Sequence, residues 1–418
     1  MAVDDKAGAP RPAGRVPFTA YQKRLFGFLS VACFFEGYDF FALSQLLPNL
    51  RAYFGLSEAQ GSNMVGVIGI GTVLAYLVIG LADRWGRRRV LTTTILGYTL
   101  FTLLSGLAPS ALIFTVCQLL ARVFLIGEWA TSMVIASEEY PAERRGLVIG
   151  VVSAAAGLGS IVCAGVVPLL LKTPLGWRAV YLVGVVPLLL VAVGRRGLRE
   201  TARFQSRSSA LPSGLLAIWK TRHARRVLEL GAIWFFCYIC TQNAVTFWKE
   251  FAVHERALSD AQVAKIIAAS ALISMPLAFA AGHFLDAVGR KLGGTLILGL
   301  LSFGVALGYS ATSTTWLAVG MIAATIGVQA TLTLLNTLTT ELFPTEQRGA
   351  AFAWSNNLLG RVGYWLSPFV IGQLVKPFGW GGVLRMTALF PLVAVLLIWL
   401  LLPETKGREL ESTAEVSS

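Results

Sequence analysis

Apolar stretches about as long as a membrane is thick recur along the whole chain, and this recurrence restricts the possible folds more than any other feature. A helix needs about 20 apolar residues to cross roughly 30 Å of hydrocarbon. A backbone that faces lipid must pair its own polar groups, which favours helices. The sequence therefore predicts an all-α membrane protein with twelve transmembrane helices, within residues 26–48, 62–82, 90–108, 111–136, 147–171, 178–194, 228–252, 262–285, 292–310, 315–340, 350–373 and 383–402.

The low content of charged residues also points to a surface covered by lipid. Of the 418 residues, 55% are hydrophobic and only 14% are Asp, Glu, Lys or Arg, whereas a soluble domain usually carries roughly 25% charge. The net charge of +13 is not evidence for nucleic acid, because the basic residues lie between apolar stretches rather than on one face. We expect the lipid bilayer as a partner and no nucleic acid. The polar first 25 residues hold no apolar core, so we expect no cleavable signal peptide.

The distribution of Lys and Arg predicts the orientation. With an even number of spans both termini lie on one side, and the segments on that side carry 25 of the 35 Lys and Arg residues. Positive residues accumulate on the cytoplasmic side, so both termini are predicted to be cytoplasmic in a multi-pass cell (inner) membrane protein. The predicted organisation is an N-terminal tail 1–25, a six-helix bundle 26–194, a basic linker 195–227, a second six-helix bundle 228–402 and a tail 403–418.

The two predicted bundles share sequence signals at one fixed offset. Asp83-x-x-Gly86-Arg87 and Asp286-x-x-Gly289-Arg290 are 203 residues apart, and the same offset relates E-E-Y-P-A-E-R-R-G at 138–146 to E-L-F-P-T-E-Q-R-G at 341–349. Gly176-Trp177 and Gly379-Trp380 repeat it again. Repetition at a constant period indicates a duplicated six-helix unit.

The loop L-A-D-R-W-G-R-R-R at 81–89 resembles the best-known signature of the major facilitator superfamily through its D-R-x-G-R-R core. The resemblance extends over nearly the whole chain and implies a midplane binding site between two halves that open alternately to each side. A carboxylate at a helix end and arginines on the next turn can pair across the halves in the outward-facing state. The predicted conformational latch comprises Asp83, Arg84, Gly86, Arg87, Arg88, Glu138, Arg145, Asp286, Gly289, Arg290, Glu341 and Arg348. The alternative is that these arginines only follow the charge bias of cytoplasmic loops.

Two acids in the first predicted span are candidates for proton coupling. Ionisable groups inside a span cost about 2.5–3.5 kcal/mol each on insertion scales, so each needs a reason. Glu36 and Asp39 are three residues apart and share nearly one helical face. Two neighbouring carboxylates in a low dielectric cannot both ionise cheaply, so at least one is expected to take up a proton readily. The alternative is a carboxylate held structurally by an arginine.

Other polar groups inside the spans are candidates for substrate binding. An unpaired guanidinium at mid-membrane suggests a carboxylate, either of the substrate or of the protein. Gln242 lies 203 residues after Asp39, so the second half carries an amide where the first carries an acid. Tyr38, Trp234, Trp248 and Tyr364 can wall a pocket for an apolar or aromatic ligand. The predicted substrate-binding set is Arg361, Arg122, Glu128, Gln242, Asn243, Gln329, Asn336, Asn356, Asn357 and Tyr38. The alternatives are structural ion pairs and hydrogen bonds between helices.

Within the superfamily, E-G-Y-D at 36–39 resembles the D-G-Y/F-D element of the aromatic acid–proton symporters. That family also has an arginine in span four and one in a G-R-x-G element, which correspond here to Arg122 and to 360–363. The I-G-E-W at 126–129 is similar to the broader metabolite–proton symporters, and L-P-E-T-K-G-R-E-L at 402–410 looks like the terminal signature of sugar porters. The resemblance implies import of a small organic anion by proton symport, with the acids of span one handling the proton.

Three other functions remain open at this point. One is a sugar or polyol carrier, the second a drug or metabolite efflux antiporter, and the third a non-transporting membrane sensor. Efflux is less expected, because span five lacks the G-x-x-x-G-P-x-x-G-G pattern usual in such exporters. We expect no enzyme, no cofactor and no metal site, since no nucleophile–base set appears and Cys237-x-x-Cys240 has no partner pair. The protein is expected to function as a monomer.

Overall fold

The computed structural model describes residues 18–194 and 215–406, and these two ranges are helical without a strand. The first range, called here the N-half, folds into α1 (Ala20–Phe54), α2 (Glu58–Trp85), α3 (Arg87–Gly106), α4 (Ala111–Glu139), α5 (Ala142–Leu170) and α6 (Trp177–Gly194). The second range, the C-half, begins with the 3-10 helix η2 (Leu215–Lys220). It continues with α8 (Ala224–Thr246), α9 (Trp248–His254), α10 (Asp260–Val288), α11 (Arg290–Gly308), α12 (Thr314–Glu341), α13 (Thr345–Phe352), the π-helix η3 (Ala353–Gly360), α14 (Arg361–Met386) and α15 (Leu389–Leu401).

The all-α membrane fold predicted from the sequence is confirmed, and each predicted span falls on one of these helices or on a series of them. Within residues 18–194 and 215–406, eight helical stretches are long and apolar enough to cross a membrane, and α8 with α9 adds a span bent by 44°. One of the eight, 346–401, covers the last two predicted spans and is broken at Gly379, whose φ is +69°. η2 and the first turn of α8 lie within the predicted linker 195–227, and the rest of that linker, 195–214, lies outside the described residues.

The duplication predicted from the sequence is visible in the backbone. Gly86 and Gly289 have φ of +95° and +103° at the start of α3 and α11, and Gly176 and Gly379 have φ of +55° and +69°. Both pairs are 203 residues apart. Glycine adopts these left-handed conformations without the steric penalty that a Cβ atom brings. The repeated glycines therefore mark the same sharp turn in each half.

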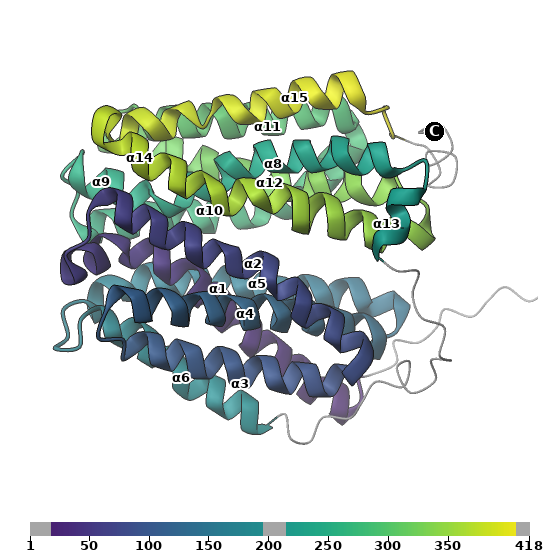
Figure 1. Ribbon diagram of the computed structural model, residues 1–418, viewed down its shortest axis with the longest axis horizontal. Coiled ribbons are helices and arrows are strands. Elements are labelled where there is room, and N and C mark those ends of the chain that lie inside the picture. Colours follow the sequence, from purple (N-terminus) through teal and green to yellow (C-terminus); the bar gives the residue numbers. More distant parts are fainter. Residues whose placement is uncertain (1–17, 195–214, 407–418) are drawn as a thin grey trace, which may run out of the picture.

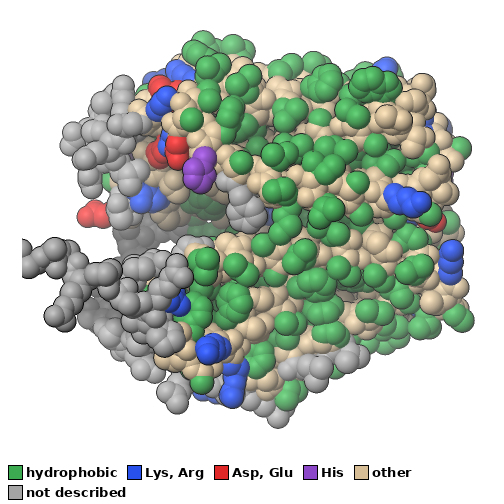
Figure 2. Space-filling model, turned by 180° about the vertical axis from the view of Figure 1, so that it is seen from behind, with side chains coloured by type: hydrophobic (Ala, Val, Ile, Leu, Met, Phe, Trp, Pro, Cys, Tyr) green, Lys and Arg blue, Asp and Glu red, His purple; other side chains and the backbone are tan. Residues whose placement is uncertain are grey.

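The helices gather into two groups, with the N-half and the C-half lying side by side (Figure 1). Both described chain ends lie at one end of the molecule, which we call the termini end, and the turn after α1 lies at the other, the far end. The halves touch where α5 packs on α10 and α2 packs on α14. In Figure 2 hydrophobic side chains cover the middle of the molecule, charged ones lie toward its two ends, and the surface is recessed between the halves at the termini end.

Within the N-half, glycines allow α1 and α5 to approach each other closely. A Cβ atom at Gly159 would overlap the carbonyl oxygen of Phe34, and one at Gly37 would overlap the carbonyl oxygen of Ala156. Small residues at such contacts are the usual device for packing membrane helices, since lipid provides no hydrophobic drive for association. The position of the acids on α1 therefore depends on this contact.

We expect Gly159→Ala to lower the thermal stability of the purified protein, because overpacking a close helix contact costs about 1–3 kcal/mol. The matched control is Gly157→Ala on the same helix, where a Cβ atom meets nothing within 4 Å. That control should leave stability unchanged or raise it, since alanine favours a helix over glycine. Equal melting temperatures for the two variants would contradict the close packing of α1 on α5.

Candidate functional site

Arg361 lies near the middle of the span that α13, η3 and α14 form, between two tyrosine rings. Its Cζ atom is 5.7 Å from the centroid of the Tyr238 ring and 5.7 Å from that of Tyr364, which is the range of a cation–π contact. Its Nε atom donates to Oδ1 of Asn357 at 3.4 Å. The described residues give Arg361 no acidic partner. A half-exposed guanidinium between aromatic walls is suited to a planar carboxylate.

The local backbone explains how Arg361 is positioned. The π-helix η3 precedes it, and such widened turns are frequent at functional sites. A Cβ atom at Gly360 would meet Trp234, and one at Gly363 would overlap the carbonyl oxygen of Phe235. Both glycines of the G-R-x-G element therefore let α14 lie directly against α8, which carries Tyr238.

Tyr238 is fixed from several sides. Its hydroxyl donates to Oδ1 of Asn356 at 2.7 Å, and its ring stacks on Trp234 with the centroids 5.2 Å apart. Trp234 in turn donates from Nε1 to Oγ1 of Thr339 at 3.1 Å. These contacts tie α8, η3 and α12 together behind Arg361, so the aromatic wall is rigid. Sequence reasoning identified Trp234, Asn356 and Tyr364 but missed Tyr238, although its position four residues after Trp234 puts both on one face.

A second group of charges lies in the N-half around Asp39. The buried carboxylate of Asp39 neighbours Arg122 of α4 and the hydroxyl of Tyr98 of α3. The ring of Phe40 covers Arg122, with the guanidinium carbon 4.3 Å from its centroid, and Phe40 itself is 39% exposed. Nη1 of Arg122 is buried and has no hydrogen-bond partner among the described residues. The predicted proton-coupling acid and a predicted substrate arginine therefore lie together, which the sequence left open.

Three other candidates turn into the interior of a half. Tyr38 donates its hydroxyl to the carbonyl oxygen of Val180 on α6 at 3.1 Å, and Glu128 accepts from Thr94 of α3 at 2.8 Å. Asn243 donates to Oγ of Ser367 at 2.8 Å, which joins α8 to α14. These three side chains make contacts between helices in this conformation. Glu36 is buried on α1, and Trp248 packs in the core of the C-half.

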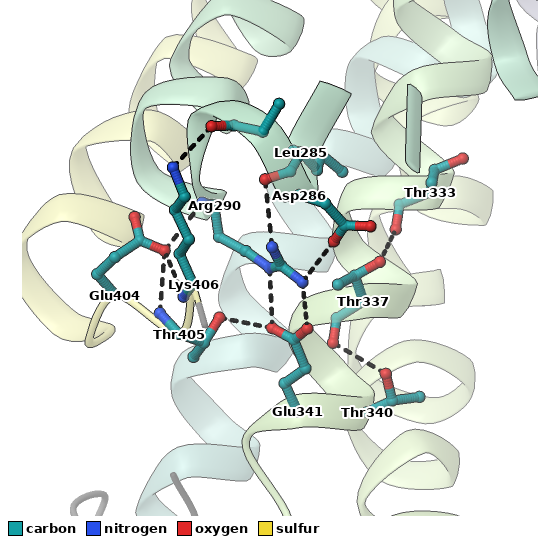
Figure 3. A network of polar contacts seen from close by, with 11 residues as sticks. Leu285, Asp286, Arg290, Thr333, Thr337, Thr340, Glu341, Glu404, Thr405 and Lys406 are labelled. Atoms are coloured by element: carbon teal, nitrogen blue, oxygen red, sulfur yellow. Dashed lines mark hydrogen bonds and ion pairs between the residues drawn. The ribbon is translucent and has the colours of Figure 1, made fainter. Parts of the chain in front are cut away.

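The remaining candidates lie on surfaces of the C-half. Gln329 and Asn336 are exposed on α12, where Thr333, Thr337 and Thr340 extend the same polar stripe toward the termini end. Thr337 and Thr340 donate to the carbonyl oxygens of the preceding turn at 2.9 Å each, as Figure 3 shows. A polar stripe on an otherwise apolar span is tolerated where it borders water or protein rather than lipid. Gln242 is half-buried on α8.

The predicted latch residues form ion pairs inside each half. Arg87 Nη2 of α3 lies 3.5 Å from Glu138 Oε1 of α4, and its repeat equivalent Arg290 Nη2 of α11 lies 2.6 Å from Glu341 Oε1 of α12. Arg290 also pairs with Asp286 at 2.9 Å (Figure 3). Pairing across the halves stays a prediction for the outward-facing state. Of the other latch candidates, Arg88 is exposed, Arg348 donates to the Phe343 carbonyl at 3.5 Å, and Asp83, Arg84 and Arg145 have side chains outside the described residues.

The end of the described chain is bound to this ion-pair network. Glu404 accepts from the backbone N–H groups of Arg290 and Lys291 at 2.9 Å each, where α11 begins, and from those of Thr405 and Lys406 at 2.9 and 3.0 Å (Figure 3). Burial acts against ionisation, but these four donors hold the pKa of the Glu404 carboxyl below its ordinary value. A carboxylate at a helix start also complements the helix dipole.

An ion pair at the far end was missed by the sequence reasoning. Nη1 of Arg51 on α1 lies 2.5 Å from Oε2 of Glu250 on α9, and the Glu250 side chain is fully buried. The same oxygen lies 3.2 Å from Nε2 of His254. This pair joins the two halves. Asp39 was selected because it is an ionisable residue within a predicted span. Glu250 lies inside the predicted span 228–252, so the same criterion applied to it.

Further contacts join the halves around this pair. Ser62 of α2 donates to the carbonyl oxygen of Pro368 on α14 at 2.6 Å, and Trp380 Nε1 donates to Glu58 of α2 at 3.1 Å. Lys249 Nζ is 3.5 Å from Asn49 Oδ1 of α1. We call Arg51, Glu250, Ser62, Trp380 and Glu58 the far-end junction.

Comparison with known proteins shows similarity to membrane transporters over nearly the whole chain. The family model described as Major Facilitator Superfamily matches residues 29–360 and 235–417. A protein of Cupriavidus pinatubonensis described as a 4-methylmuconolactone transporter is 25% identical over 99% of this chain and 95% of its own. A gallate transporter of Pseudomonas putida is 24% identical over 91% of this chain and 90% of its own. The crystal structure of a D-xylose–proton symporter, 18% identical, superposes with a TM-score of 0.74 over 93% of this chain and 100% of that one.

We expect Glu404→Gln to destabilise the protein at neutral pH by about 1–2 kcal/mol, because an amide accepts the four N–H bonds more weakly than a carboxylate. A carboxyl with a lowered pKa contributes stability above its unfolded pKa of about 4.3, and this contribution is lost as the pH falls through the folded value. The difference between wild type and variant should therefore shrink on acidification. Thermal denaturation from pH 7 to pH 4 measures it, with exposed Glu346→Gln as the control. A difference independent of pH would contradict the assignment.

Proposed function

Because the chain belongs to the major facilitator superfamily, we propose that it imports a small organic anion together with protons through alternating access. As a member of this superfamily, the chain is a multi-pass membrane transporter of small organic metabolites and not an enzyme. The observation that carries the anion proposal is Arg361, which faces two tyrosines and has no acid beside it among the described residues. The names of two relatives, which refer to gallate and to 4-methylmuconolactone, agree with an oxygenated ring compound as substrate.

We propose that the protein lies in the inner membrane with both termini in the cytoplasm. The far end is then the outer side. It is closed by the far-end junction, where α1 and α2 bind α9 and α14. The recess between the halves at the termini end would open inward (Figure 2). The conformation is thus inward-facing, and the outward-facing state requires the junction to break.

The substrate carboxylate would bind Arg361. A planar guanidinium forms two parallel hydrogen bonds to a carboxylate, while the rings of Tyr238 and Tyr364 supply aromatic walls. Asn357 lies at hydrogen-bond distance of the guanidinium and restrains its orientation. A sugar would use amides and hydroxyls instead, so the need for a positive charge at position 361 separates the two substrate classes.

Coupling would occur in the N-half. When Asp39 is ionised it neutralises Arg122, whose guanidinium it neighbours. When Asp39 takes up a proton, Arg122 loses that counter-charge and its free Nη1 becomes a stronger site for an anion. Binding of the proton and binding of the anion then favour each other. With both bound, the site carries little net charge, so the protein can pass through a state that is closed to both sides. The exposed ring of Phe40 would shield Arg122 from water until substrate arrives.

We expect Asp39→Asn to abolish accumulation of labelled gallate driven by a proton gradient in proteoliposomes, because the amide cannot exchange a proton. Exchange of gallate across the membrane without a gradient should persist, since the neutral side chain resembles the protonated state. Glu346→Gln, which changes an exposed acid at the termini end, is the control. Gradient-driven accumulation that survives in Asp39→Asn at normal expression would rule out this acid as the proton carrier.

We expect Arg361→Gln to reduce uptake by about 100-fold, and Arg361→Lys to restore only part of it, because lysine does not form the bidentate pair. Uptake of gallate at a series of concentrations measures the effect, with exposed Arg222→Gln as control. A mild effect of Arg361→Gln would favour a sugar or polyol carrier over an organic-anion carrier.

We expect Glu250→Gln to open the outer side, because it leaves Arg51 buried without its counter-charge, which costs about 3–5 kcal/mol in buried ion pairs. The buried Ser62→Cys reports the opening by its rate of alkylation, since the five native cysteines are all buried. That rate should rise at least tenfold in Glu250→Gln, because each 1.4 kcal/mol lost from the closed state changes the equilibrium tenfold. Glu229→Gln, which breaks pairs at the termini end, should leave it unchanged. An unchanged rate in Glu250→Gln would show that the pair does not hold the junction closed.

A further inference from the structure

A buried acid in the interior of the N-half has no part in the transport cycle described so far. Glu128 on α4 is fully buried, and an ionisable side chain inside a span is costly to insert into a membrane. Its contact with Thr94 of α3 needs only a hydrogen-bond acceptor, which a glutamine would supply at a lower cost. A carboxyl group at this position therefore needs a function that uses its proton.

The proton on Asp39 has no direct way out of the N-half. In the proposed inward-facing conformation Asp39 is only 5% exposed, and Glu36, the other acid of α1, only 3%. A proton that leaves Asp39 on this side therefore does not pass straight into the recess between the halves and needs polar groups to carry it. Such groups lie on one face of α3.

Tyr98 and Thr94, one turn apart on α3, connect α1 with α4. The Tyr98 hydroxyl donates to a backbone carbonyl oxygen of α1 at 3.1 Å and neighbours both Asp39 and Glu36. Oγ1 of Thr94 lies 2.8 Å from Oε2 of Glu128 on α4. Residues four apart share a helical face with about 5–6 Å between their Cβ atoms, and water bridges polar groups across gaps of this size. The polar face of α3 therefore leads from the acids of α1 to Glu128.

The contacts of Thr94 suit both protonation states of Glu128. Its hydroxyl oxygen lies 2.9 Å from the carbonyl oxygen of Val90 and 3.1 Å from that of Leu91, in addition to its contact with Glu128. When Glu128 is ionised, the hydroxyl donates to the carboxylate. When Glu128 carries a proton, the acid donates to Oγ1 and the hydroxyl donates to a carbonyl of its own helix. Glu128 therefore gains and loses a proton without a change in helix packing.

Glu128 also lies between Asp39 and the termini end. Arg122, which neighbours Asp39, precedes Glu128 by six residues on α4, and this helix runs toward the termini end. Six residues of helix correspond to about 9 Å. Oγ of Ser132 lies one turn farther and 3.4 Å from Oε1 of Glu128, and the ion pair between α3 and α4 lies where the helix ends. The position of Glu128 thus fits the inner side of a proton route.

We propose that Glu128 is a proton relay, a second acid that receives the proton of Asp39 and passes it toward the termini end. Asp39 gives its proton to the water beside Tyr98 and returns to its ionised form next to Arg122. The proton moves along the hydroxyls of Tyr98 and Thr94 to the carboxylate of Glu128. Glu128 then loses it to water from the termini end. This inference rests on the proposed proton symport and adds the route by which the proton leaves.

Two substitutions at Glu128 separate a relay from a structural contact. Glu128→Gln keeps the size of the side chain and an acceptor for Thr94 but does not exchange a proton, whereas Glu128→Asp keeps the acid and shortens the side chain. In proteoliposomes with a proton gradient we expect Glu128→Gln to slow net uptake of labelled gallate about tenfold or more, since a positioned acid–base group speeds proton transfer about 100-fold or more. Glu128→Asp should be the less impaired variant. The reverse order would identify a structural contact and overturn the relay.

Exchange of gallate without a gradient separates the relay from the primary proton site. Exchange requires no release of the proton in each turn, so Glu128→Gln should exchange gallate at the wild-type rate. Its final accumulation under a gradient should also equal that of the wild type, because Asp39 still sets the coupling. Thr94→Val should likewise slow net uptake and spare exchange. Thr99→Val, which removes a buried hydroxyl of α3 that donates to the Ile95 carbonyl at 2.7 Å, is the matched control and should change neither.

The outcomes distinguish the relay from the symport on which it rests. Net uptake at the wild-type rate in Glu128→Gln, with normal accumulation in the wild type, would overturn the relay alone. An equal loss of exchange and of net uptake would overturn it as well, since a structural defect slows both. If the wild type does not accumulate gallate under a proton gradient, the symport fails and the relay with it. Thr94→Val keeps the test decisive if Glu128→Gln does not fold.

Discussion

The ion pair between Arg51 and Glu250 is the contact on which the arrangement of the two halves depends. It is buried, it joins α1 to α9, and it lies among the hydrogen bonds that bind α2 to α14. A buried pair is stable only while both partners are present, because either charge alone pays the full cost of leaving water. Such a junction is stable while the pair is intact. Once the junction opens, water solvates both charged side chains, so the open state is not strongly disfavoured. These are the properties that a reversible closure between two bodies requires.

The charges at the termini end act differently. Arg87 with Glu138 and Arg290 with Glu341 connect neighbouring helices of a single half, at the same offset in each. Glu404 adds the chain end to the second of these pairs. Each half is therefore stabilised as a unit at the end where the two halves are separated by a recess. Rigid halves and one breakable junction are what the proposed rocking motion needs, by which a central site would reach the two sides in turn.

Much of this could be read from the sequence, and the parts that could not be read have a common cause. The length of the apolar stretches predicted the spans, and the offset of 203 residues predicted the duplicated turns and identified both members of each duplicated ion pair. Spacing along one helix does not determine how that helix is rotated against its neighbours. For this reason Tyr38 and Glu128, chosen for type and depth, turn toward α6 and α3. Glu250 was missed because it lies close to the end of the predicted span 228–252, where a charged residue is common and does not by itself indicate a contact between the halves.

The most direct test of the account is a pair of distances measured by spin labels in the same protein. Arg89→Cys with Glu346→Cys reports the separation of the halves at the termini end, and Ala52→Cys with Ala261→Cys reports it at the far end; all four positions are exposed. When gallate is added at acidic pH, we predict that the first distance shortens in part of the molecules while the second lengthens in the same fraction. Two distances that change in the same direction, or that do not change at all, would contradict alternating access about the far-end junction.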